Sequence, residues 1–343
     1  MKDKLKNVSK RTLLIMVICL ISLISIGSYA VISSKGILIS KSENKAKKSI
    51  IKVTETVKPA EKVPEFDYLS YSKAELSIKG LVNSSDLYKM KTLLKKIQGI
   101  EKVLIDLENG IADVFFDEAI LQNADIIAEK IEEKSDFQAQ ITKVLTKDEI
   151  SSEDDYNQKI KTLYAATVND FDISMADLNK EVDMYKSQYR KRYGDDVFNS
   201  PSSSQIYENI NAQSMMALID DAVLRSNIYK SDFSIKNDIV EKEIATMLKG
   251  NSLTLEEAAK SYGYNDKDYF YKKLETQVLI QNFADNKLFK ANTKNEQKGL
   301  LYNKWVADCK SLCKTKYYNS NLKAAVDKAK SCGIDGCGDP GCK

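Results

Sequence analysis

Histidine is absent from the 343 residues, while tryptophan occurs once and proline four times. Without histidine the chain has no histidine general base, no Ser-His or Cys-His nucleophile pair and no mixed Cys/His metal site. The groups left for chemistry are carboxylates, lysines, tyrosines and thiols. Whether the chain is an enzyme stays open at this point, and its residue content favours a non-enzymatic role.

The chain also lacks a large excess of either charge. It has 52 lysines and arginines against 49 aspartates and glutamates, for a net charge of +3. A nucleic-acid-binding domain usually carries a clear basic excess. We therefore expect no nucleic-acid partner.

Long apolar runs are missing everywhere except near the N-terminus. Residues 12–32 carry no charged side chain and follow the basic segment 1–11. About 20 apolar residues span a bilayer, and a basic flank stays on the cytoplasmic side. We expect a single-pass membrane protein with most of the chain outside the cytoplasm. A signal peptide cleaved after Ala30 is the alternative, and it places the chain on the same side.

The composition then changes several times along the chain. A linker rich in Lys, Glu, Ser and Thr has too little apolar surface to fold alone. A short acidic, turn-like connector follows the first folded part. The expected segments are 1–11 (cytoplasmic), 12–32 (transmembrane helix), 33–70 (linker), 71–147 (first domain), 148–167 (connector), 168–325 (helical domain) and 326–343 (Cys/Gly-rich tail).

The first domain reads as four strands and two helices. Alternating strands are expected at 74–80 and 137–145, and helices at 85–99 and 119–134. Residues 100–117 contain two strands joined by Asn-Gly, a strong hairpin signal. The predicted order is βαββαβ.

This domain resembles the heavy-metal-associated domain, the ferredoxin-like fold of copper chaperones. The resemblance is carried by "IQGIEKVLIDLENGIADVFFD" and "AEKIEEKSDFQAQI". The family holds metal in a Met-x-Cys-x-x-Cys loop, where this chain has Leu81, Asn83 and Asp86. The resemblance therefore implies the fold without its two thiolate ligands, because Asn and Asp offer only hard oxygens.

Residues 168–325 have the periodicity of successive amphipathic helices. Ser174 is the expected N-cap of the first and Gly194 its end, while Thr254 and Glu257 form a capping box further on. We expect this domain to be all-α.

The helical domain resembles the N-terminal chaperone domain of SurA-type foldases. The residues that carry this are "FDISMADLNKEVDMYKSQY", "SMMALIDDAVLRSNIYKSDFSIKNDIVEKEIATM" and "LTLEEAAKSYGYNDKDYFYKKLETQVLIQNF". The resemblance implies helices that cradle extended or unfolded polypeptide. In the family a parvulin prolyl-isomerase domain commonly follows, but too few residues follow Lys316 here to form one. Prolyl isomerase activity is therefore not expected.

Five cysteines are candidate metal ligands outside the membrane. Two of them stand four apart on a predicted helix and so share one face. The other three lie in a glycine-rich tail that cannot form a core. Three interpretations stay open: a disulfide staple, a soft-metal site for Cu(I), Hg(II) or Zn, and redox thiols. The residues are Cys309, Cys313, Cys332, Cys337 and Cys342.

The predicted fold class is α+β: a transmembrane helix, a βαββαβ ferredoxin-like domain, and an all-α SurA-like domain with a cysteine-rich tail. The first functional hypothesis is a membrane-anchored, extracytoplasmic, chaperone-like protein that binds extended polypeptide without isomerase catalysis. The alternative is a thiol-based handler of copper or mercury, with a metal transporter as partner. A third hypothesis is an inactive relic of an isomerase that serves as an assembly factor.

Overall fold

The computed structural model describes residues 66–150, 155–231, 233–290 and 292–331. The described residues from Asp67 onward belong to one compact unit. None of their helices is both long and apolar enough to cross a membrane. The transmembrane helix predicted at 12–32 and almost all of the predicted linker lie outside the described residues, as do the last three cysteines.

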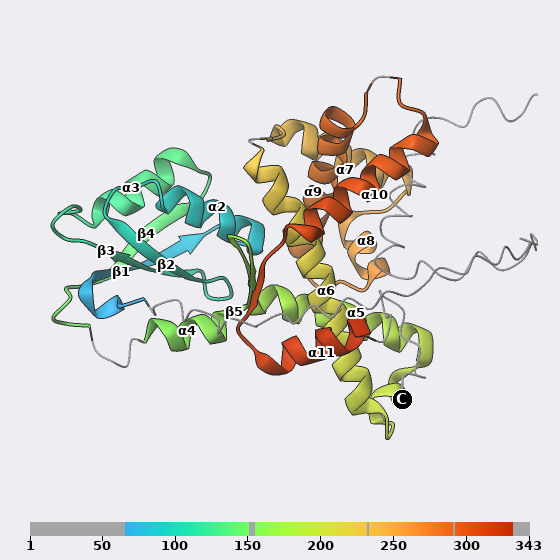
Figure 1. Ribbon diagram of the computed structural model, residues 1–343, viewed down its shortest axis with the longest axis horizontal. Coiled ribbons are helices and arrows are strands. Elements are labelled where there is room, and N and C mark those ends of the chain that lie inside the picture. Colours follow the sequence, from blue (N-terminus) through green and yellow to red (C-terminus); the bar gives the residue numbers. More distant parts are fainter. Residues whose placement is uncertain (1–65, 151–154, 232, 291, 332–343) are drawn as a thin grey trace, which may run out of the picture. The chain divides into compact units, whose positions relative to one another are not determined.

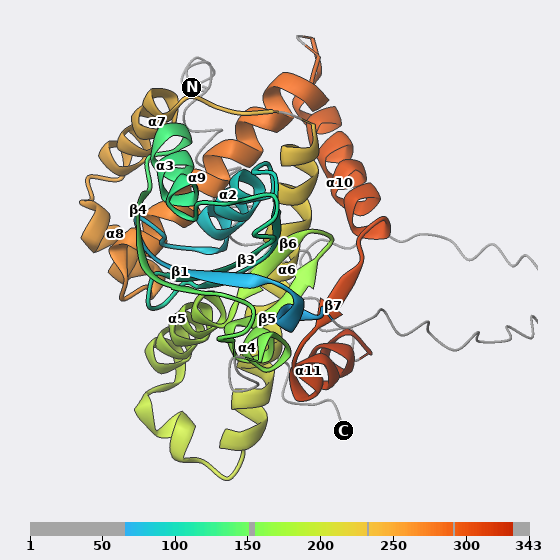
Figure 2. The same ribbon diagram turned by 90° about the vertical axis from the view of Figure 1, so that its left-hand side faces the viewer.

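The first part of the unit is the predicted βαββαβ arrangement. Its four strands form an antiparallel sheet in the order β2-β3-β1-β4. Helices α2 and α3 cover one face of the sheet, and α4 lies on the other (Figures 1 and 2). The bounds are β1 Ser72–Lys79, α2 Ser84–Leu94, β2 Ile100–Asp106, β3 Ile111–Phe116, α3 Asp125–Lys134, β4 Gln138–Leu145 and α4 Tyr156–Leu163.

Alternation along the strands fixes which side chains enter each face. Ala74, Leu76 and Ile78 of β1 are almost fully buried, on alternate positions. On the other face, the ring of Tyr156 from α4 meets Phe115 edge-on, with centroids 5.7 Å apart. The expected hairpin between β2 and β3 is confirmed, with Gly110 at φ +65° and the Ile78 carbonyl oxygen close against it.

The second part is mainly helical, and several of its predicted ends are confirmed. The Ser174 hydroxyl accepts the Asp177 N–H at 2.9 Å, and α5 ends at Gly194. Thr254 and Glu257 form the expected capping box. The bounds are α5 Met175–Tyr193, α6 Ser203–Lys230, α7 Asn237–Gly250, α8 Leu255–Tyr262, α9 Lys267–Phe283, α10 Asn295–Ser311 and α11 Ser320–Ser331, with a π-helical turn at Ala284–Leu288.

The expectation of an all-α domain at 168–325 is wrong, because a second sheet has two strands within it and a third that falls mostly in the predicted connector 148–167. Strands β5 (Tyr164–Val168), β6 (Phe171–Ser174) and β7 (Thr315–Tyr317) pair in the order β6-β5-β7. Asn169 adopts φ 54° in the turn between β5 and β6, and its side chain accepts the Lys314 N–H at 3.1 Å. The sheet thus joins the two ends of the helical segment.

Two further differences concern the C-terminal end. Helix α10 stops at Ser311, three residues before its predicted end, so Cys313 lies beyond the helix. Helix α11 continues past residue 325, where the tail was expected to begin, and buries Val326 and Ala329. Both views show α11 beside α6 (Figures 1 and 2).

Candidate functional site

The loop before α2 contains Asn83 and Asp86, the two residues that the sequence resemblance aligns with the metal-binding cysteines of the heavy-metal-associated pattern. Here Asn83 caps α2: its side-chain oxygen accepts the N–H groups of Ser85 at 2.9 Å and Asp86 at 3.2 Å. In return an Asp86 carboxylate oxygen accepts the Asn83 N–H at 3.3 Å. Both side chains are buried. The side-chain oxygens of Asn83 and Asp86 are therefore used to start a helix.

The same loop docks the first sheet onto the helical part. The Ser84 N–H donates to the Asp177 carboxylate at 2.7 Å, and the Ser84 hydroxyl accepts the Ser174 N–H at 3.0 Å. Next to it the hydroxyls of Ser85 and Tyr229 are 2.7 Å apart. Because these groups are 90 or more residues apart in the chain, the contact is tertiary. The loop is an internal docking surface.

Charged groups reinforce the docking on either side of the loop. Lys91 of α2 pairs with Asp172 of β6 at 2.6 Å and lies over the Tyr164 ring, 4.4 Å from its centroid. Burial would lower the pKa of Lys91, but Tyr164 and Asp172 together raise it above its ordinary value. Lys272 of α9 approaches Asp86 at 3.6 Å. Because these ion pairs are shielded from water, they help to fix the position of α2 against the helical part.

A partly buried ionic cluster lies within the helical part, where α5, α6 and α9 meet. The Lys273 ammonium is 3.0 Å from Glu181 and 2.6 Å from Asp221. The Tyr269 hydroxyl donates to Glu181 at 3.0 Å, and Tyr264 lies further out at 3.4 Å. Sequence reasoning missed this cluster, because its members come from three helices and the loop before α9 and follow no local spacing. Every member of the cluster has a partner within it. We therefore interpret the cluster as a structural contact that holds α5, α6 and α9 together.

Of the predicted metal ligands, the structure describes two. Cys309 is buried in the main core, whereas Cys313 is half-buried and its sulfur is 3.5 Å from the Thr315 hydroxyl. Both thiols are free. Because α10 ends at Ser311, the expectation that both cysteines share one helix face is wrong. No group of three or more acidic, Cys or His side chains that could hold a metal ion occurs among the described residues.

The two thiols should differ in reactivity. Burial and the Asp308 carboxylate raise the pKa of the Cys309 thiol, which reduces its thiolate fraction. In a full chain whose other four cysteines are alanine, a disulfide reagent should modify Cys313 about tenfold faster than Cys309, or more. Mass spectrometry after short exposure would measure this. Equal rates would show that Cys309 is accessible and restore it as a candidate ligand.

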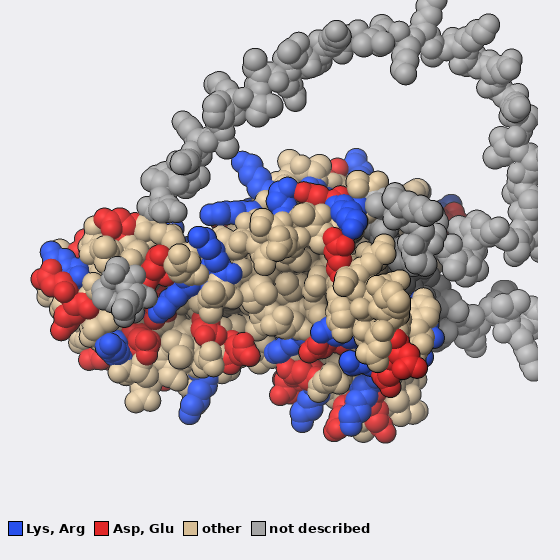
Figure 3. Space-filling view, turned by 90° about the horizontal axis from the view of Figure 1, so that it is seen from below, with Lys and Arg blue, Asp and Glu red and all other residues tan. Residues whose placement is uncertain are grey.

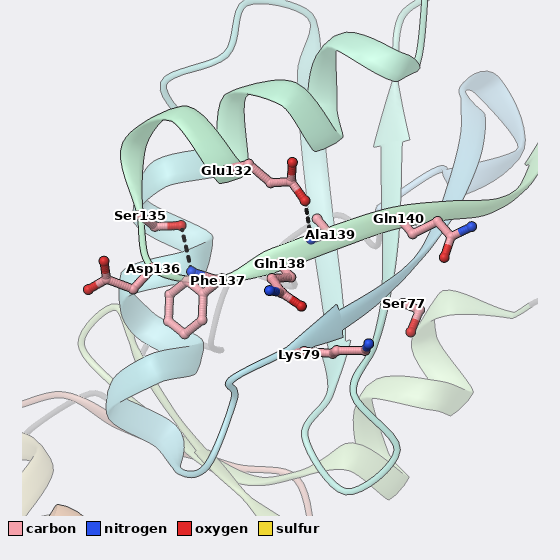
Figure 4. Close-up of a pocket in the computed structure, with 9 residues that line it drawn as sticks. All are labelled: Ser77, Lys79, Glu132, Ser135, Asp136, Phe137, Gln138, Ala139 and Gln140. Atoms are coloured by element: carbon pink, nitrogen blue, oxygen red, sulfur yellow. Dashed lines mark hydrogen bonds between the residues drawn. The ribbon is translucent and has the colours of Figure 1, made fainter.

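A surface hollow of about 460 Å³ lies at the start of β4. It is bordered by the end of α3 and by the ends of β1 and β4, with Glu132, Asp136 and Lys79 among its charged residues (Figure 4). Elsewhere, the face seen from below has acidic and basic side chains interspersed around an uncharged stretch (Figure 3). Neither sign forms a continuous patch on that face.

Comparison with known proteins gives one family match. Residues 130–268 match the SurA-like N-terminal domain. The match runs from within α3 to the first turn of α9 and supports a SurA-like N-terminal domain in this part of the chain. A solved copper binding domain from HMA7, a P-type ATPase, is 25% identical over 21% of this chain and 96% of its own, with a TM-score of 0.20. No curated protein matches the chain.

Proposed function

We propose that the protein is a chaperone-like factor that holds extended or unfolded polypeptide. The single observation that carries this is the SurA-like match over residues 130–268. The structure supports the proposal through the character of the segment: several helices around a core, with exposed apolar side chains such as Tyr193, Ile239 and Leu253. Exposed apolar side chains offer contacts to unfolded chains without demanding a particular sequence.

The proposal places this activity outside the cytoplasm, at a membrane. Its support is the uncharged run at 12–32 behind a basic N-terminal segment. We also propose that binding proceeds without prolyl isomerisation, since the chain has no histidine for a parvulin-type site. Thiol-based metal handling stays a prediction: none of the described contacts favours it, and three of the five cysteines lie outside the described residues.

Two assays on the full chain test the proposal. Light scattering should show that an equimolar amount suppresses aggregation of a chemically unfolded client on dilution. A proline-containing peptide assay should show no isomerisation above the uncatalysed rate. Unchanged aggregation would overturn the holding function, whereas isomerisation that persists through stringent purification would overturn only the claim about catalysis.

A further inference from the structure

The two edge strands of the first sheet, β2 and β4, differ in whether their outward backbone groups have partners. At the β2 edge, the Tyr164 hydroxyl accepts the Ile105 N–H at 2.8 Å and donates to the Ile105 carbonyl at 3.2 Å. That edge is therefore closed by a fully buried side chain. At the other edge, no strand among the described residues pairs with the outer side of β4. An unpaired edge offers a row of backbone donors and acceptors.

The register shows which backbone groups face outward. On β1 the Ile78 N–H points toward β3, where it donates to the Gly110 carbonyl at 2.7 Å. Its neighbours along β1 therefore point toward β4, where Ser77 pairs with Gln140. It follows that Ala139 and Ile141 direct their N–H and C=O groups away from the sheet. The Ala139 N–H reaches only a solvent-exposed side chain, the Glu132 carboxylate, at 3.3 Å (Figure 4).

We propose that this edge receives a short extended segment of a client polypeptide, which adds to the sheet as a fifth strand beside β4. The inference rests on the proposed holding function and names where the backbone of the client is held. Only an extended backbone presents donors and acceptors that alternate at the spacing of Ala139 and Ile141. Glu132 keeps the Ala139 N–H occupied until the added strand replaces it.

The structure also sets the length and charge of the segment. Beyond Ile141 the pairing with β1 shifts register by one residue at Thr142, whose hydroxyl donates to the Glu75 carbonyl at 3.0 Å, and it then resumes from Lys143 to Leu145. An added strand that keeps the register of Ala139 and Ile141 is therefore interrupted at this bulge. The hollow beside Ala139 contains the carboxylates of Glu132 and Asp136 on the α3 side. A lysine or arginine of the client fits that side of the hollow better than an acidic residue.

The experiment measures the affinity of the full chain for labelled peptides by fluorescence anisotropy. The probe is an unstructured twelve-residue peptide of alternating Val and Thr with one central Lys. Its matched controls are the same peptide N-methylated on alternate amides and a version with Glu in place of the Lys. N-methylation removes the donors that strand addition needs, so affinity should fall about tenfold or more. The Glu peptide should bind up to about fivefold more weakly.

Two protein variants complete the design. Ala139→Pro removes the outward N–H but leaves the bonds between β4 and β1, because proline is tolerated on an edge strand where its nitrogen faces solvent. It should weaken binding about tenfold. Ala139→Val, which keeps the N–H, should bind like the original chain, and circular dichroism should show the same fold for both.

Each outcome is decisive. If the N-methylated peptide or Ala139→Pro binds as tightly as its control, the edge is not the site, although the holding function stands as long as unfolded clients are bound. Light scattering could instead show that the original chain is a dimer and that Ala139→Pro is a monomer with unchanged peptide affinity. In that case the edge pairs two copies of this chain, and the proposal is overturned. If the original chain binds neither peptides nor unfolded clients, the holding function itself fails and this inference fails with it.

Discussion

Replacing Lys273 by methionine should lower the free energy of unfolding by about 2–4 kcal/mol, somewhat less than the usual result of removing one partner of a fully buried ion pair. The ammonium contacts Glu181 at 3.0 Å and Asp221 at 2.6 Å, and the Glu181 side chain is only 2% exposed, whereas Lys273 and Asp221 are 19% and 25% exposed. Without Lys273, Glu181 stays buried with only tyrosine hydroxyls to stabilise it. Urea unfolding of the full chain, followed by circular dichroism, would measure the loss.

Lys260→Met is the matched control. Lys260 pairs with Glu256 at 2.8 Å, but both side chains are more than 60% exposed. Exposed pairs contribute little, so this variant should unfold at nearly the same urea concentration as the original chain. An equal loss of stability in the two variants would contradict the conclusion that Lys273 holds α5, α6 and α9 together.

The effect of Lys273→Met should also depend on pH. Burial would lower the pKa of Lys273, but Asp221 and Glu181 raise it well above its ordinary value. Its contribution is therefore complete below the unfolded lysine pKa of about 10.4 and is lost as the pH rises through the folded value. Burial alone would raise the pKa of Asp221, yet Lys273 and Arg225 lower it. That contribution is lost as the pH falls below about 3.9. The stability that Lys273→Met loses relative to the original chain should therefore be largest between these two pH values.

Placing a Cys-x-x-Cys pattern in the loop before α2 should not create a metal site. In a chain whose natural cysteines are alanine, the double change Asn83→Cys and Asp86→Cys should cost about 2–4 kcal/mol, because it removes the N-cap of α2 and its reciprocal bond. The new thiols would lie in the loop that docks against α5, α6 and α9, where the original side chains are 3% and 2% exposed. We expect no micromolar Cu(I) affinity in a competition titration with a chromophoric chelator.

The control places the same pair at the same spacing on an exposed helix start. Thr254 and Glu257 form an equivalent capping box at the beginning of α8, and both are exposed. Changing both to cysteine should give tighter Cu(I) binding than the pair at 83 and 86. Micromolar binding by the buried pair, with native stability, would show that the loop is accessible to a metal ion and that its docking contacts are dispensable.

Local signals predicted much of this fold. Caps at Ser174 and Thr254, the helix end at Gly194 and the hairpin at Gly110 each depend on a few neighbouring residues, and all are confirmed. Alternation and helical periodicity were enough to give the βαββαβ order. The SurA-like segment was likewise recognisable, because its pattern of caps and core positions is local.

What the sequence did not reveal depends on contacts between distant residues. β7 is only three residues long and exists because it pairs with β5, about 150 residues earlier. The contact between Ser84 and Asp177 produces no periodic pattern in the sequence. One local signal does predict the start of α2: Asn83 is followed three residues later by Asp86, which is the spacing of a capping box.

The holding function is tested most directly by comparing one client in its unfolded and folded states. The client is a fluorescently labelled small protein that is held unfolded by reduction of its disulfides and is folded when oxidised. By fluorescence anisotropy the full chain should bind the unfolded form with micromolar affinity and leave the folded form free. Equal binding of both forms, or binding of neither, would contradict the account.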